Sequence, residues 1–184
     1  IAVSLVPSIV ERNYRITLPF ELDLLITSAI FFHTFFGEGL DFYKRYWLWD
    51  KILHVYSSGV AAIIAFIITF TLHYTRKLRM PLPLIWVFTV SFSLALGAMW
   101  EMLEFGVDIG FGKTTQNGLE DTMYDLINDL IGGFVIATLG VIYVRFSNPE
   151  TRKRLARPIG EAFGVAHRLD RIRDSRKNRG ANTP

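Results

Sequence analysis

The sequence has no cysteine, and this absence excludes a disulfide framework, thiol catalysis, iron–sulfur clusters and cysteine zinc sites. Charge is also sparse: Asp, Glu, Lys and Arg make up 20% of the 184 residues, whereas 51% are hydrophobic and fifteen are Phe. A soluble domain of this length usually carries more charge and less Phe, so the apolar excess must face something other than water. The composition therefore indicates a membrane protein.

Apolar runs mark the expected membrane spans. Three runs, 52–74, 82–106 and 126–146, are long enough to cross a hydrocarbon core as helices. A fourth, 22–37, is shorter. Windows such as VAAIIAFIITFTL lack the polar face that a helix of a soluble bundle would need.

The expected fold is therefore an all-α integral membrane protein, a bundle of four transmembrane helices, or five if a further span precedes the first. The start, IAVSLVPSIV, lacks the charged beginning and cleavage pattern of a signal peptide, and we expect the amino terminus to be truncated. The predicted organisation is an N-terminal segment 1–21, a transmembrane helical domain 22–146 and a basic amphipathic tail 147–184.

Lys and Arg are unevenly distributed, and this bias predicts the orientation. Residues 145–184 hold eleven Lys/Arg against four Asp/Glu, whereas residues 1–144 hold nine against thirteen. The loop RKLR at 76–79 and the tail therefore belong on the cytoplasmic side. We expect a multi-pass protein of the inner (cytoplasmic) membrane with both termini cytoplasmic.

The tail places apolar residues at helical spacing among arginines, with Pro158 starting a second segment. These residues are Leu155, Ile159, Phe163, Ala166, Leu169 and Ile172. The pattern is typical of a helix that lies on anionic lipid headgroups or binds a partner subunit, for instance in a larger membrane complex. No base-reading motif is present, so no nucleic-acid partner is expected.

Ionisable residues at the span ends are the most informative feature, since charge inside a membrane is expensive. They share helical spacing within each segment: Asp50 and His54; Glu101, Glu104 and Asp108; Asp121, Asp125 and Asp129. With four spans in alternating directions, all three groups reach the same membrane level, near the extracytoplasmic leaflet. So many carboxylates must share protons, pair with Lys51 or Arg45, or bind a cation.

Three interpretations remain open. In the first, a divalent metal such as zinc, manganese or iron is held by His54, Glu101, Glu104 and Asp125, with Asp50 and Asp121 as further candidates. Such a metal could activate water, with Asp121 or Asp129 as the catalytic base. In the second, the cluster relays protons or cations. In the third, it only pins the helices together.

A haem is the weaker alternative. His54 and His73 are nineteen residues apart, about 28 Å along a helix, so they cannot bind one iron together. A pair formed by His33 and His54 from two helices would be needed instead.

Several motifs resemble the YjdF-type multi-pass inner-membrane proteins, a domain of unknown function, and more widely the VanZ-like proteins. They are FFHTFFG around His33, WDKILH at 49–54, MWEMLEF with Glu101 and Glu104, and EDTMYD with Asp121 and Asp125. The resemblance covers about residues 20–145. It implies a shared polar site at Asp50, His54, Glu101, Glu104, Asp121 and Asp125, without implying a reaction.

The leading functional hypothesis is an integral membrane protein of the envelope with a buried acidic and histidine site that binds a cation or metal. The sequence does not decide whether the protein is an enzyme; if the site is catalytic, the expected reaction is a metal-assisted hydrolysis or transfer on a lipid-linked substrate. The alternative is a non-catalytic accessory subunit of a larger membrane protein complex.

Overall fold

The protein is a bundle of long helices. The computed structural model describes residues 20–162 and 164, and within them the chain is almost entirely helical, without strands. Four helical segments are long and apolar enough to cross a membrane: Phe20–Gly39, Trp47–Tyr74, Leu82–Phe111 and Leu119–Phe146. The predicted all-α fold with four spans is confirmed.

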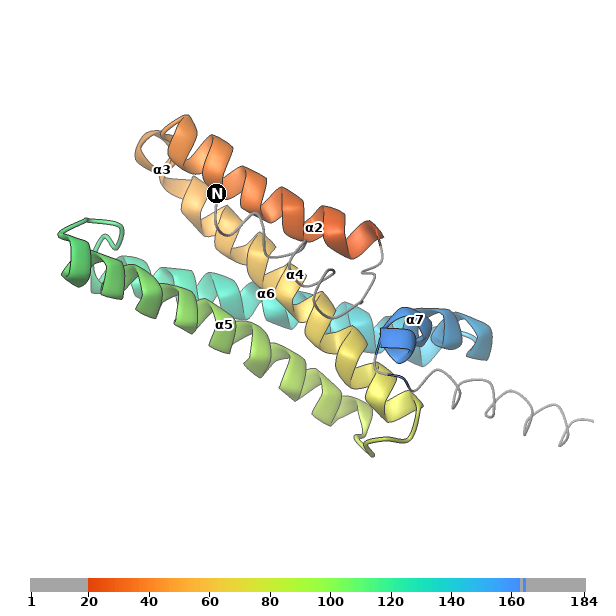
Figure 1. The fold of residues 1–184 in the computed structure, drawn as a ribbon. Coiled ribbons are helices and arrows are strands. Elements are labelled where there is room, and N and C mark those ends of the chain that lie inside the picture. The colour runs from red at the N-terminus through yellow and green to blue at the C-terminus, as the bar shows by residue number, and fades with distance from the viewer. Residues whose placement is uncertain (1–19, 163, 165–184) are drawn as a thin grey trace, which may run out of the picture.

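The first span combines two kinds of helix. Helix α2 (Phe20–Phe31) continues into a π-helix, η2 (Phe32–Gly39), and a short helix α3 (Phe42–Arg45) follows. The three longer spans are α4 (Trp47–Tyr74), α5 (Leu82–Phe111) and α6 (Leu119–Phe146), and α7 (Pro149–Ala162) comes after them. Figure 1 shows α2, α4, α5 and α6 as long helices running alongside one another, with α7 at one end of the bundle.

Local sequence explains where the long helices begin and end. Pro81 precedes α5 and a second proline lies in its first turn, where a missing N–H costs no helical hydrogen bond. Gly112 ends the same helix with φ +64°, a left-handed conformation that glycine adopts without strain. Glu120 and Asp121 lie in the first turn of α6, where negative charge is favourable.

The helices extend beyond the apolar runs that predicted them. Helix α4 begins at residue 47 instead of 52, α5 ends at 111 instead of 106, and α6 begins at 119 instead of 126. Apolar content alone set the predicted limits, whereas helical hydrogen bonding continues wherever the polar side chains find partners. The acidic residues therefore lie on regular helix rather than in loops.

Helix α4 is the centre of the bundle, because it contacts α2, α5, α6 and α7. It approaches α6 closely at Gly132, where a Cβ atom would overlap the Ser58 hydroxyl and the Val55 carbonyl. Large apolar side chains such as Leu103, Ile109 and Phe134 are exposed on the outside of α5 and α6. An outside of this kind suits lipid rather than water.

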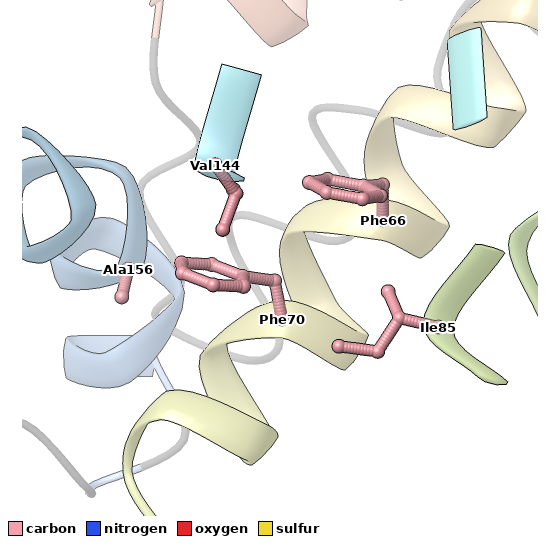
Figure 2. Close-up of a cluster of buried hydrophobic side chains, with 5 residues drawn as sticks. All are labelled: Phe66, Phe70, Ile85, Val144 and Ala156. Carbon is pink, nitrogen blue, oxygen red and sulfur yellow. The ribbon is translucent and has the colours of Figure 1, made fainter. Parts of the chain in front are cut away.

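The main hydrophobic cluster lies near the end of the bundle where α7 packs. Figure 2 shows Phe66 and Phe70 of α4 beside Ile85 of α5, Val144 of α6 and Ala156 of α7. Ala156 is fully buried. This cluster ties the start of the tail to the spans.

Two expectations about the tail change here. The prediction that Pro158 starts a second segment is wrong: α7 runs through Pro158, since burial of Ala156 and Ile159 on either side outweighs one lost helical hydrogen bond. Part of the apolar face expected to meet lipid or a partner subunit, at Leu155 and Ile159, instead packs on the bundle or is buried. The predicted positions Phe163, Ala166, Leu169 and Ile172 lie outside the described residues, as do 1–19 of the N-terminal segment.

Candidate functional site: an acidic cluster between three helices

The ionisable residues of three helices meet at one end of the bundle. The start of α4, the end of α5 and the start of α6 lie at the same end, opposite α7 (Figure 1). Side chains from all three helices come within ion-pair distance of one another there. The prediction that the three groups of ionisable residues meet at one level of the bundle is confirmed.

Lys51 is the cation at the centre of this cluster. Its Nζ donates hydrogen bonds to Asp125 Oδ1 at 2.7 Å, to Asp125 Oδ2 at 2.9 Å and to Asp50 Oδ2 at 3.1 Å. It also donates to Asp121 Oδ1. The Lys51 side chain is only 14% exposed, so these contacts are made largely out of solvent. Lys51 thus joins α4 to α6.

His54, one turn further along α4, faces carboxylates through both ring nitrogens. Nδ1 lies 3.2 Å and 3.3 Å from the two carboxylate oxygens of Asp129, which is almost fully buried. Because a carboxylate only accepts, Nδ1 carries a hydrogen in this pair. Nε2 then faces Asp50 Oδ1 at 3.7 Å, Glu101 Oε1 at 3.7 Å and Asp125 Oδ1 at 4.0 Å.

Glu101 brings an unsatisfied carboxylate to the same place. It is the α5 contribution to the cluster and is 5% exposed. Its Oε1 makes no hydrogen bond with the described part of the chain, although it lies 3.7 Å from His54 Nε2. A buried carboxylate oxygen without a partner is costly, so a proton or a cation at this point would stabilise it.

Asp50, His54 and Asp125 together have the geometry of a small ligand set. One ligand atom from each lies within 4.8 Å of the others. Asp129 adds the carboxylate that commonly orients a metal-binding histidine through its other nitrogen. Asp129 fits because Gly97 of α5 has no side chain: a Cβ atom there would overlap the Asp129 carboxylate.

The other predicted acids have different surroundings. Glu104 accepts a hydrogen bond from Trp100 Nε1 at 2.9 Å, one turn beyond Glu101. Asp108 accepts from the backbone N–H groups of Thr115 and Gln116 at 2.7 Å and 2.9 Å. Asp108 thus holds the loop between α5 and α6.

Two groups outside the spans have shifted acidity. Burial, together with the nearby Asp50 and Glu104 carboxylates, raises the pKa of the Tyr43 phenol well above its usual range. The hydrogen bond from Lys44 lowers the pKa of the exposed Asp41 carboxyl. The neutral Tyr43 hydroxyl and His33 Nδ1 share a hydrogen bond of 2.6 Å.

Comparison with known proteins places the chain in a family. The sequence model of a family described as a predicted membrane protein (DUF2238) matches residues 1–146. The chain belongs to this family.

The DUF2238 match ends at the last residue of α6, so it includes the acidic cluster and excludes α7. A relative described as an uncharacterized protein, from Thermotoga maritima, is 35% identical over 138 residues, covering 72% of this chain and 68% of its own. No solved structure matches. The protein is thus a multi-pass membrane protein of DUF2238, while the YjdF-type and VanZ-like resemblances stay predictions.

The sequence pattern predicted most of this cluster, including a pairing of the carboxylates with Lys51. It gave Lys51 as one of two candidate partners, yet Lys51 contacts three carboxylates. Asp129, predicted with Asp121 as a candidate catalytic base, pairs with His54, and the catalytic role stays a prediction. The i, i+4 spacing from Asp125 to Asp129 on α6, alongside Asp50 and His54 on α4, was the available signal.

Proposed function

We propose that this DUF2238 protein binds a divalent cation between α4, α5 and α6. The observation that carries the proposal is the set of Asp50, His54 and Asp125 ligand atoms within 4.8 Å, beside the unpartnered buried oxygen of Glu101. Five carboxylates meet there, and Lys51 and His54 supply at most two positive charges. A cation would offset this excess.

The donor set favours zinc, manganese or iron. An imidazole combined with carboxylates suits these metals, whereas magnesium and calcium prefer oxygen ligands alone. The His54–Asp129 pair supports the choice, because a neutral His54 that donates Nδ1–H to Asp129 would present the lone pair of Nε2 toward Asp50 and Glu101. Glu104, also predicted as a ligand, accepts a hydrogen bond from Trp100 instead and is not one of the three residues whose ligand atoms lie within 4.8 Å.

The proposed setting is the outer half of the cytoplasmic membrane. The basic loop at 76–79 and the start of the tail lie at the end of the bundle opposite the acidic cluster, so cytoplasmic placement of those segments would put the cluster near the extracytoplasmic leaflet. A metal there could assist hydrolysis or transfer on a lipid-linked envelope substrate. Asp121, whose side chain is 25% exposed, would be the base, since Asp129 is buried against His54.

The test is elemental analysis of protein purified in mild detergent without chelator. We expect near-stoichiometric zinc, manganese or iron in the wild type and its loss in His54→Ala. His73→Ala is the matched control, because His73 lies in the last turn of the same helix, far from the cluster. Glu101→Gln keeps the side-chain shape and should also lose metal.

Metal that persists in both His54→Ala and Glu101→Gln would overturn the proposal, as would a wild type without metal. The cluster would then share protons or hold the helices together. A native mass measurement of the same samples would show whether the chain instead purifies as a subunit of a larger complex.

A further inference from the structure

A cavity of about 430 Å³ lies beside the acidic cluster, and the proposed cation site accounts for only part of it. Its walls come from α2 and η2 on one side and α5 on the other, with α4 between them. Asp50 and His54 line both the cavity and the proposed cation site. Asp129, which pairs with His54, lines it too, whereas Glu38, Tyr43 and Trp100 belong to neither the hydrophobic core nor that site.

The charged lining is complementary to a cation. Within the described residues the cavity is lined by three carboxylates and two imidazoles, and by no Lys or Arg: Glu38, Asp50, Asp129, His33 and His54. Glu38 stands at the more open side, with its side chain 69% exposed. The three carboxylates would repel a negatively charged group placed beside them, whereas they would attract an ammonium group.

Aromatic rings add a second feature that suits an ammonium group. Trp100 of α5 meets the His33 ring edge to face, with centroids 5.4 Å apart, and Tyr43 packs on His33 at 5.7 Å. Trp100 and Tyr43 both line the cavity. Trp and Tyr faces attract ammonium groups, and the neutral Tyr43 hydroxyl adds a hydrogen-bonding group.

The remaining lining combines hydroxyl groups, from Thr34, Ser57, Ser58 and Ser93, with an apolar wall that lies within the spans. Ala29 and Ile30 of α2, Leu53 of α4 and Leu96 of α5 form this apolar wall. Leu96 is itself 39% exposed, so this apolar wall is accessible from outside the packed core. A ligand with a polar cationic end and an apolar body matches this division.

We propose that the cavity binds a membrane lipid whose headgroup carries an ammonium, with that group beside Glu38, Tyr43 and Trp100 and the lipid body along Ala29, Ile30 and Leu96. The proposal goes beyond the cation site and does not depend on it, because Glu38, Tyr43 and Trp100 are not among the proposed metal ligands.

The test is native mass spectrometry of the full chain in detergent with equal amounts of phosphatidylethanolamine and phosphatidylglycerol of identical acyl chains. We expect the wild type to retain the ethanolamine lipid in preference. Glu38→Gln and Trp100→Leu should each reduce that preference about tenfold. Glu120→Gln is the matched control: Glu120 is exposed in the first turn of α6 at the same end of the bundle and does not line the cavity.

Equal retention of the two lipids by the wild type would overturn the proposal, and so would an unchanged preference in both Glu38→Gln and Trp100→Leu. Complete competition by soluble phosphoethanolamine would assign the cavity to a small amine instead of a lipid. Metal content measured on the same samples separates the two proposals. A lipid preference without bound metal would support the lipid site and contradict the cation site. Bound metal without a lipid preference would support the cation site and contradict the lipid site.

Discussion

Lys51 is the residue on which the interpretation of the acidic cluster depends. Its ammonium already lies among Asp50, Asp121 and Asp125, where a metal could otherwise neutralise the same carboxylates. Asp121 and Asp125 are therefore shared between an internal cation and any bound one. Glu101 and the Nε2 atom of His54 have no hydrogen bond to Lys51, and they remain the groups most in need of an external cation.

Lys51→Met should lower the thermal unfolding temperature in detergent. The substitution leaves buried carboxylates without their partner, a change that costs about 3–5 kcal/mol in buried pairs. If the cluster binds cations, added manganese or zinc should restore part of the loss, because the metal would take over the missing charge. If no divalent cation restores the unfolding temperature, the result would favour a cluster that only holds the helices together.

Lys44→Met is the control for that measurement. Lys44 also pairs with an aspartate, Asp41, at 2.9 Å, but its side chain is 82% exposed and that of Asp41 is 51% exposed. Solvent screens such a pair, so the unfolding temperature should hardly change, with or without metal.

At the scale of the helices, the site depends on close contact between α5 and α6. Because Gly97 of α5 has no side chain, the Asp129 carboxylate of α6 has room to reach His54 of α4. Ser93, one turn earlier on α5, donates a hydrogen bond to the Ser58 carbonyl of α4 at 2.7 Å. Small residues of this kind let membrane helices approach closely enough for polar contacts.

Gly97→Ala should displace Asp129 and so impair the His54 pairing. We expect reduced metal retention and a lower unfolding temperature, measured as above. Gly106→Ala, in the same helix, is the matched control, since a Cβ atom there meets nothing within 4 Å. The control should be neutral or slightly stabilising, because Ala favours helix more than Gly. Equal effects of the two substitutions would contradict the role assigned to Gly97.

At the scale of the whole molecule, the bundle has two unlike ends. One carries the acidic cluster, and the other carries the hydrophobic cluster that holds α7 beside the basic loop at 76–79. The cytoplasmic placement of that basic end is still a prediction from Lys and Arg bias.

The absence of native cysteine makes the orientation directly measurable. Lys113→Cys lies in the loop between α5 and α6, and Lys77→Cys lies in the loop between α4 and α5; both native side chains are exposed. A membrane-impermeant thiol reagent added to intact cells should label the Lys113→Cys variant alone, and both variants after permeabilisation. The reverse pattern would place the acidic cluster on the cytoplasmic side.

Sequence by itself determined the four spans, the fold class and the level at which the acidic residues meet. These follow from apolar run length, helical periodicity and the alternating direction of successive spans, all of which are local or topological. Tertiary structure alone decided the partners: Lys51 with Asp121 and Asp125, His54 with Asp129, and Ala156 in the hydrophobic cluster. These pairings depend on the rotation and spacing of packed helices, which close contacts such as those at Gly97 and Gly132 set and which no single segment encodes.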